Sequence, residues 1–118
     1  MTPEEMKKRL KDYALRCIKL AASLPSGAPG DVIRWQLTKA STSAAANYRA
    51  ACIARSRADF VSKLGMVEEE ADESVFWVDL ATDAQLVKRT LVQGLLVEGE
   101  EIVKIVAQSR ITAKSVHA

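Results

Sequence analysis

The sequence predicts an all-α protein, an antiparallel up-down-up-down four-helix bundle in a single domain spanning residues 1–118. Three observations favour this fold class. The three prolines all lie within the first 29 residues, so the rest of the chain lacks this helix breaker. Strand-like alternation of apolar and polar residues is scarce. Four stretches instead repeat apolar residues at alternating steps of three and four, the spacing of an amphipathic helix.

The first helix is expected over residues 3–24. Thr2 is a suitable N-cap, Pro3 suits the first helical position, and Glu5 completes a capping box. The segment PSGAPG at residues 25–30 should end the helix, because proline and glycine punctuate helices. Its apolar stripe consists of Met6, Leu10, Tyr13, Cys17, Leu20 and Leu24.

The second helix is expected over residues 31–54. Beyond Leu37 its stripe carries only small side chains and one amide, which would let a neighbouring helix approach closely. A break is expected at residues 54–56, because Ser56 and Asp59 have the spacing of a capping pair for the next helix. The stripe consists of Ile33, Leu37, Ala40, Ala44, Asn47 and Ala51.

The third helix is expected over residues 56–82 and the fourth over residues 87–109, with a frayed tail at residues 110–118. Thr82 and Gln85 also have capping spacing, so the boundaries of the turn between these helices stay open. The third stripe is Phe60, Leu64, Val67, Ala71, Ser74, Val78 and Ala81. The fourth is Leu91, Val92, Leu95, Leu96, Gly99, Ile102, Val103 and Val106.

Asn47 and Ser74 are polar members of otherwise apolar stripes. A buried amide needs hydrogen-bond partners, because burial without them costs free energy. One interpretation is a polar pairing that fixes the register of the helices, and the other is contact with a ligand or a partner chain. We favour helix pairing, with Ser74 as the neighbour of Asn47 across the bundle.

A candidate basic surface lies where the second helix gives way to the third. It consists of Arg49, Arg55, Arg57 and Lys63, and it would suit RNA or DNA. The alternative is that these cations pair with carboxylates of the segment VEEEADES at residues 67–74, in the same or a neighbouring subunit. The expected acidic partners are Glu69, Glu70, Asp72 and Glu73.

The net charge of +2 shows that the whole molecule is not a strong polycation. Nucleic-acid binding would therefore require a local patch, or a patch repeated by self-association. Two further modest basic patches fit phosphate contacts, although such patches also occur on proteins that bind no nucleic acid. They are Lys7, Lys8, Arg9 and Lys11 in the first helix, and Lys104, Arg110 and Lys114 near the C-terminus.

Three aromatic side chains are candidates for an oligomer interface. Trp35 lies off the apolar stripe of its helix, and so does Trp77. Phe76 and Trp77 are adjacent, so both rings cannot face the same core. A large exposed ring usually marks a protein interface, and this pattern indicates self-association.

No catalytic, cofactor or metal site is predicted. The carboxylates of residues 67–74 raise the possibility of a metal-carboxylate enzyme, but di-metal sites in bundles need paired Glu-x-x-His motifs. The one histidine is His117, in the expected tail. The segment GAPGD lacks the lysine and hydroxyl residue of a phosphate-binding loop. We therefore expect no enzyme, no cofactor and no small-molecule substrate.

A cytoplasmic protein without membrane contact is expected. Cys17 and Cys52 lack the spacing of metal ligands and lie in apolar helical contexts, which favours buried, reduced thiols. The first residues, MTPEEMKKRLKDY, are charged and lack the apolar core of a signal peptide. No stretch of about 18 uncharged apolar residues, as a membrane span would need, is present.

The order of these features resembles a bacterial family of four-helix-bundle proteins named for reading frames within intervening sequences of 23S rRNA genes. The resemblance covers roughly residues 13–106, and the spacing of its residues carries more weight than any single one. On the second helix the matching residues are Gln36, Leu37, Ala40, Ser43 and Asn47. On the third they are Phe60, Lys63, Leu64, Glu69, Glu70, Ala71, Asp72, Glu73, Ser74 and Trp77.

One departure from the family pattern is clear. Many members follow the asparagine with Ile-Ala-Glu-Gly, whereas Asn47 is followed by Tyr48, Arg49, Ala50 and Ala51. The acid of that motif is absent, so its partner cannot be transferred to this chain. The resemblance implies a bundle that assembles into a ring, often a pentamer. Accessory proteins of diversity-generating retroelements look like relatives, and these are basic pentamers that associate with nucleic acid and a reverse transcriptase.

The sequence therefore predicts a non-enzymatic, homo-oligomeric scaffold or accessory protein that contacts nucleic acid through repeated basic patches. The alternative prediction is a protein-protein interaction module without nucleic-acid binding.

Overall fold

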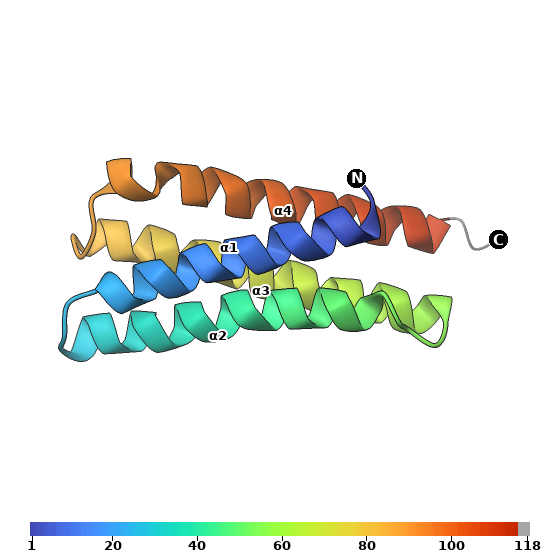
Figure 1. The fold of residues 1–118 in the computed structure, drawn as a ribbon, viewed down its shortest axis with the longest axis horizontal. Coiled ribbons are helices and arrows are strands. Elements are labelled where there is room, and N and C mark those ends of the chain that lie inside the picture. Colours follow the sequence, from blue (N-terminus) through green and yellow to red (C-terminus); the bar gives the residue numbers. More distant parts are fainter. Residues whose placement is uncertain (116–118) are drawn as a thin grey trace.

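The computed structural model describes residues 1–115, which form four helices and no strand. The helices are α1 (Pro3–Ser23), α2 (Ala28–Ala51), α3 (Arg57–Asp83) and α4 (Arg89–Ser115). They lie side by side in an elongated bundle of 50 × 22 × 20 Å, in which α1 begins and α4 ends at the same end (Figure 1). Helices adjacent in the chain pack together and α4 closes against α1, so the predicted up-down-up-down bundle is confirmed.

Two predicted helix starts are confirmed by their caps. The Thr2 hydroxyl accepts a hydrogen bond from the Glu5 N–H at 3.1 Å, and the Thr2 N–H donates to the Glu5 carboxylate at 3.3 Å. Ser56 accepts from the Asp59 N–H at 3.0 Å, and α3 begins at the next residue. Both caps satisfy N–H groups that a helix start would otherwise leave without partners.

The boundaries of α2 differ from the prediction. The helix begins at Ala28 rather than at residue 31, because Pro29 is tolerated in a first turn where its missing N–H is not needed. Gly27, with a φ of 118°, supplies the preceding bend. The helix ends at Ala51 rather than at residue 54.

The predicted frayed tail is wrong for residues 110–115, which continue α4. Contacts with α3 hold this extension in place. Arg110 forms an ion pair with Glu68 at 2.8 Å, and the Arg57 guanidinium donates to the Ala113 carbonyl at 3.1 Å. Residues 116–118, including His117, lie outside the described part of the chain. The turn before α4 covers residues 84–88, so Thr82 lies inside α3.

The predicted apolar stripes form the core, with few exceptions. Leu10, Leu37 and Leu64 have no exposed surface. Asn47 is half-buried, and Leu91 is 76% exposed although it was expected in the core. Within residues 1–115, no helix combines the length and apolarity that a membrane span requires.

A buried polar contact crosses the bundle from α1 to α3. The Tyr13 hydroxyl lies 2.7 Å from the Ser74 hydroxyl, which itself donates to the Ala71 carbonyl at 2.6 Å. Ser74 has only one hydroxyl hydrogen, so Tyr13 must donate to Ser74. Gly99 of α4 makes room for the ring, because a Cβ there would lie 2.6 Å from the Tyr13 oxygen. Burial raises the pKa of Tyr13 well above its usual range, so this donor keeps its proton.

Candidate nucleic-acid interface

An open groove of about 650 Å³ runs between α1 and α2, and its walls are mainly cationic. Ala45 and Ala46 leave space between the two helices because their side chains are too short to fill it. Part of the small-residue segment of α2 therefore shapes a surface feature. The groove is lined by Glu4, Lys7, Lys8, Lys11, Ala45, Ala46 and Arg49, and we call it the cationic groove.

The cations of the cationic groove are only partly neutralised. Lys7 pairs with Glu4 at 2.8 Å, and Lys8 pairs with Asp12 at 2.7 Å. Lys11 and Arg49 form no salt bridge among residues 1–115.

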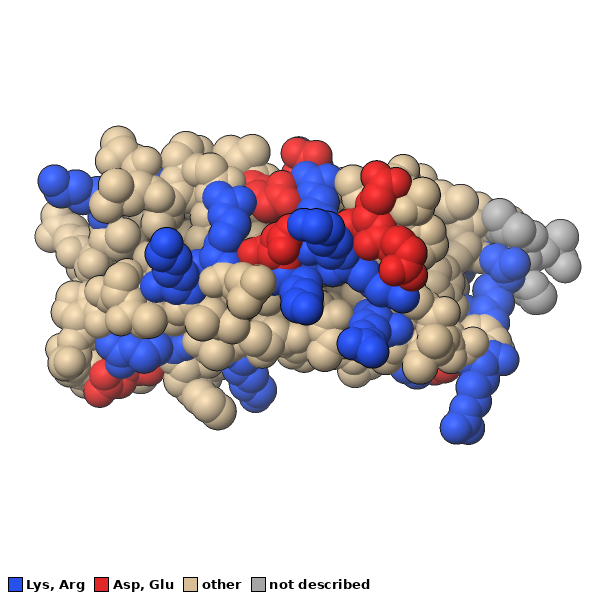
Figure 2. All heavy atoms as spheres, in the orientation of Figure 1, with Lys and Arg blue, Asp and Glu red and all other residues tan. Residues whose placement is uncertain are grey.

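The two walls of this groove also repel each other. The hydrogen bond to Glu4 raises the pKa of Lys7, while the charge of Arg49 acts in the opposite direction. Arg49 is thus close enough to repel Lys7, and an anion between them would relieve this repulsion. Figure 2 shows lysine and arginine side chains gathered over the middle of this face, with carboxylates beside them.

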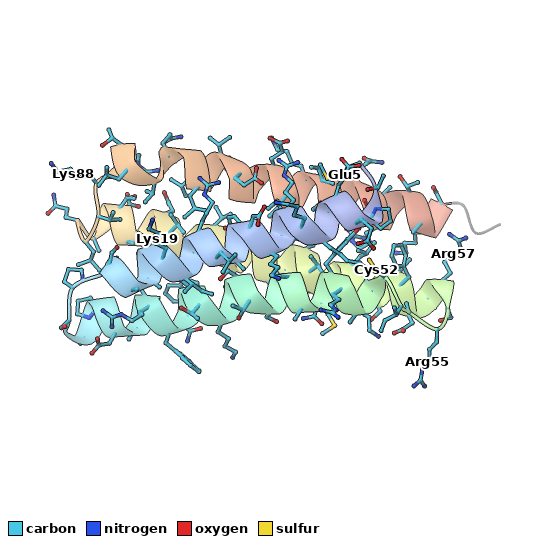
Figure 3. The ribbon with its side chains drawn as sticks, in the orientation of Figure 1. Glu5, Lys19, Cys52, Arg55, Arg57 and Lys88 are labelled. Carbon is cyan, nitrogen blue, oxygen red and sulfur yellow. The ribbon has the colours of Figure 1, made fainter. Side chains whose placement is uncertain are left out.

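The single basic surface predicted from the sequence does not form. Arg49 joins the lysines of α1, whereas Lys63 pairs with Asp59 at 2.7 Å. Arg57 donates to the Ala113 carbonyl, and Arg55 is exposed at the end of the bundle. Figure 3 shows Arg55 and Arg57 pointing in different directions. The structure therefore regroups the predicted residues, with Arg49 in the cationic groove.

The predicted pairing of these arginines with α3 carboxylates also fails within the chain. Within the acidic segment of α3 at residues 67–74, Glu68 forms a salt bridge, and its partner is Arg110 of α4. Among residues 1–115, the four predicted acidic partners, Glu69, Glu70, Asp72 and Glu73, form no salt bridge. Pairing with a neighbouring subunit stays a prediction.

The electrostatics of Glu70 show how crowded this acidic segment is. Partial burial is the first cause of its raised pKa, and the charges of Glu73 and Glu69 raise it further. The charge of Lys39 on α2 acts in the opposite direction and lowers the pKa of Glu70, but Lys39 and Glu70 form no salt bridge within residues 1–115. The segment therefore presents negative charge that the described part of the chain leaves largely uncompensated.

The structure corrects the expected pairing of Asn47 with Ser74. The Asn47 amide donates to the Ser43 carbonyl at 2.9 Å and to the Ser43 hydroxyl at 3.1 Å, both within α2. Ser74 is fully buried and binds Tyr13 instead. Sequence reasoning missed Tyr13 because an aromatic ring on an apolar stripe was counted as core, and its hydroxyl was not assigned a partner.

The candidate interface aromatics differ in exposure. Trp35 is 66% exposed and Phe76 is 53% exposed, as an interface role would require. Trp77 is half-buried and packs against the core, with its ring 4.9 Å from that of Phe76 at an interplanar angle of 78°. Its Nε1 is buried and has no hydrogen-bond partner among residues 1–115. Trp35 and Phe76 thus remain the stronger candidates for an oligomer interface.

The described residues offer little for chemistry at a metal or a thiol. Within residues 1–115, no three His, Cys, Asp or Glu side chains are grouped so that they could hold a metal ion. Cys17 is a buried free thiol, and burial raises its pKa to about 11, which keeps it protonated and unreactive. Cys52 is also free but only half-buried, in contrast to the predicted burial.

Comparison with known proteins places the chain in a family. Residues 4–108 match the family described as 23S rRNA-intervening sequence protein. The chain belongs to this family. The predicted resemblance is therefore confirmed.

A solved structure supports the same family assignment. It is the 1.70 Å crystal structure of a protein of unknown function from the S23 ribosomal protein family of Bacteroides thetaiotaomicron. The two chains are 28% identical, with a TM-score of 0.85, and the match covers 93% of this chain and 98% of that one. No curated protein matches the chain.

The sequence did contain a pattern that points to the cationic groove. Lys7 and Lys11 are four residues apart and share a helix face, as do Ala45 and Arg49. Antiparallel packing of α1 on α2 brings these two faces together. The pattern was missed because Arg49 was grouped with the arginines that follow it in the chain.

Proposed function

We propose that this member of the 23S rRNA-intervening sequence protein family is a self-associating, non-enzymatic accessory protein that contacts RNA or DNA through the cationic groove. The observation that carries this proposal is the convergence of Lys7, Lys8, Lys11 and Arg49 from two helices, with Glu4 as the one carboxylate of the lining. A phosphate backbone suits this arrangement, because each phosphate neutralised by a lysine or arginine releases counterions.

The groove favours recognition of the backbone over recognition of sequence. Its lining has lysine and arginine side chains but no aromatic ring on which a base could stack. Phosphate contacts position a protein without reading bases. Binding should therefore be salt-dependent and depend little on sequence. The family description refers to 23S rRNA, which supports RNA as the first ligand to test.

Self-association would repeat the groove and so strengthen a weak contact. A net charge of +2 per chain gives little long-range attraction, but several linked grooves bind with avidity. Exposed Trp35 and Phe76 support an interface between copies. A ring, with five subunits as the family resemblance implies, is the assembly we propose.

A second candidate function is a protein-interaction module that binds no nucleic acid. The exposed large apolar side chains favour it, among them Leu91 at 76% and Ile53 at 81%. In that case the cationic groove would meet an acidic protein surface instead of phosphate.

Binding of labelled single-stranded RNA, followed across salt concentrations, tests the groove. Lys11→Gln/Arg49→Gln removes two groove cations that have no salt bridge within residues 1–115. Loss of two phosphate contacts should lower the slope of log K against log salt by roughly 1 to 2 units. The matched control is Arg55→Gln/Lys88→Gln, which removes two exposed cations at opposite ends of the bundle (Figure 3).

The two variants separate a localised site from general attraction. We expect the control to keep the wild-type slope within about 0.5 unit. Equal losses in the two variants would contradict a site in the groove. Absence of any binding by the wild-type protein at low salt, to RNA and to DNA, would leave the protein-interaction module as the better account.

A further inference from the structure

The solvent side of α3 carries a ridge that is both apolar and acidic. Met66, Glu69, Glu73 and Phe76 follow one another at steps of three, four and three, which places them on one face of the helix. Met66 is 47% exposed and Phe76 is 53% exposed. The two carboxylates form no salt bridge among residues 1–115. We call these four residues the α3 ridge.

A second surface with the opposite charge lies on α1 and α2, near the loop that joins them. Leu15 is 54% exposed and Ile18 is 39% exposed on α1, and Trp35 is 66% exposed on α2. Exposed Lys19 and Lys39 accompany them, and neither forms a salt bridge within the described chain. Lys39 lies on the side of α2 towards α3, where its charge also acts on Glu70. We call these five residues the hairpin face; Figure 3 labels Lys19 on α1.

Hydrogen bonds at the loop hold the two halves of the hairpin face together. The Arg34 guanidinium donates to the Ala21 carbonyl at 3.2 Å and to the Leu24 carbonyl at 2.7 Å. These bonds fix the beginning of α2 beside the last turn of α1. Trp35 follows Arg34 directly, so it lies at the same end of the hairpin as Ile18 and Lys19.

We infer that the α3 ridge of one copy docks onto the hairpin face of a second copy, an inference that rests on the self-association in the proposed function. The charges are complementary, because two unpaired carboxylates would meet two unpaired amines. Large apolar side chains stand on both surfaces, so contact would remove them from water together. The α3 ridge is too acidic to accept a phosphate backbone.

The two surfaces belong to different helices: the α3 ridge lies on α3, and the hairpin face lies on α1 and α2. One copy can therefore use its α3 ridge and its hairpin face at the same time, with two different neighbours. Such a heterologous contact produces a closed ring when its rotation closes. The cationic groove lies at the other end of the hairpin, beside Lys7 and Arg49, and stays open in this arrangement.

Charge reversal with rescue tests the inference. Glu69→Lys/Glu73→Lys makes the α3 ridge basic, and Lys19→Glu/Lys39→Glu makes the hairpin face acidic. Each pair should convert the assembly to monomers at micromolar concentration, with at least a tenfold weaker association measured by sedimentation. The chain with all four substitutions restores opposite charges and should assemble again. Asp83→Lys/Glu100→Lys is the control, because it changes two other exposed carboxylates and should keep the wild-type mass.

The outcomes distinguish this inference from the proposed function. Assembly retained in both charge-reversed pairs would overturn the inference and leave self-association standing through other surfaces. Failure of the fourfold variant to assemble would also overturn it. A monomeric wild-type chain would remove self-association itself, while RNA binding by the groove variants is measured separately. Loss of RNA binding without loss of mass in Lys19→Glu/Lys39→Glu would assign the hairpin face to nucleic acid and overturn the docking.

Discussion

The contact between α2 and α3 differs in kind from the contact between α1 and α4. The first is the most extensive helix contact in the bundle and the second is the sparsest. On α2, the buried Ala40, Ala44 and Ala51 let the helices approach closely. Between α1 and α4, Arg9 pairs with Glu98 at 2.7 Å and with Glu101 at 2.9 Å.

The difference shows that one bundle uses two sources of stability. The contact of α2 with α3 depends on apolar burial, which responds little to pH. The contact of α1 with α4 depends on ion pairs and on the Tyr13 ring beside Gly99. The addition of a single atom, or the protonation of a single carboxylate, should therefore destabilise the α1–α4 contact more than the α2–α3 contact.

The largest loss of stability is expected from Leu64→Ala, in the apolar core under α3. Leu64 has no exposed surface, and truncation of a buried leucine costs about 2 to 5 kcal/mol. Urea unfolding should show this loss with the same size at pH 7 and pH 4. Ile53→Ala is the control, because Ile53 is 81% exposed and should change stability by less than about 0.5 kcal/mol. Similar losses in the two variants would contradict the assignment of the core.

Gly99→Ala should disrupt the α1–α4 contact, because the added Cβ would overlap two neighbouring atoms. The new Cβ would lie 2.6 Å from the Tyr13 oxygen and 2.6 Å from a methyl carbon of Val75. Overpacking of this kind costs about 1 to 3 kcal/mol. In a Tyr13→Phe background the overlap with the hydroxyl oxygen is absent, while Val75 and the ring carbon Cζ at 3.1 Å remain, so the same substitution should cost less. A double-mutant cycle measures this difference, and an equal cost in both backgrounds would show that Tyr13 is not the constraint.

Features that depend on local spacing could be predicted from the sequence. The four apolar stripes gave the bundle, and the Thr2 and Ser56 caps gave two helix starts, because each needs only residues within a few positions. The candidate site was harder, because its cations come from two helices. Lys11 and Arg49 are 38 positions apart in the chain.

Long-range polar partners were not predictable because they depend on the relative heights of the packed helices. Arg110 was expected in a frayed tail, yet it meets Glu68 and helps to extend α4. Tyr13 was counted as apolar, yet its hydroxyl spans the bundle to Ser74. Hydrophobic periodicity gives the direction of a side chain but not the atom that it reaches on another helix.

A smaller, pH-dependent effect is expected at the Arg9–Glu98 pair. Hydrogen bonding to Arg9 lowers the pKa of Glu98 below its usual value. The pair therefore stabilises the fold above the unfolded carboxyl pKa of about 4.3, and this stability is lost as pH falls through the lowered pKa. Glu98→Gln should cost about 1 kcal/mol at pH 7 and much less near pH 3.

Unfolding followed from pH 7 to pH 3 measures this difference. Glu100→Gln is the control, because Glu100 is exposed and forms no salt bridge within residues 1–115. A loss for Glu98→Gln that stays constant with pH would show that packing, and not the charge, accounts for the contribution of this side chain.

The smallest effect is expected from Asn47→Ala, at the residue that the sequence marked for helix pairing. Within residues 1–115, both hydrogen bonds of its amide nitrogen go to Ser43 of the same helix, so the substitution removes no hydrogen bond between helices. Alanine also has a higher helix propensity than asparagine, which offsets part of the lost bonds. The isolated chain should lose less than about 0.5 kcal/mol, whereas Ser74→Ala should lose about 1 to 2 kcal/mol by leaving the Tyr13 hydroxyl without its acceptor. If Asn47→Ala instead lowers the mass of the assembly while the monomer keeps its stability, the partner of Asn47 belongs to a neighbouring subunit, and its polar position on α2 serves assembly rather than the fold.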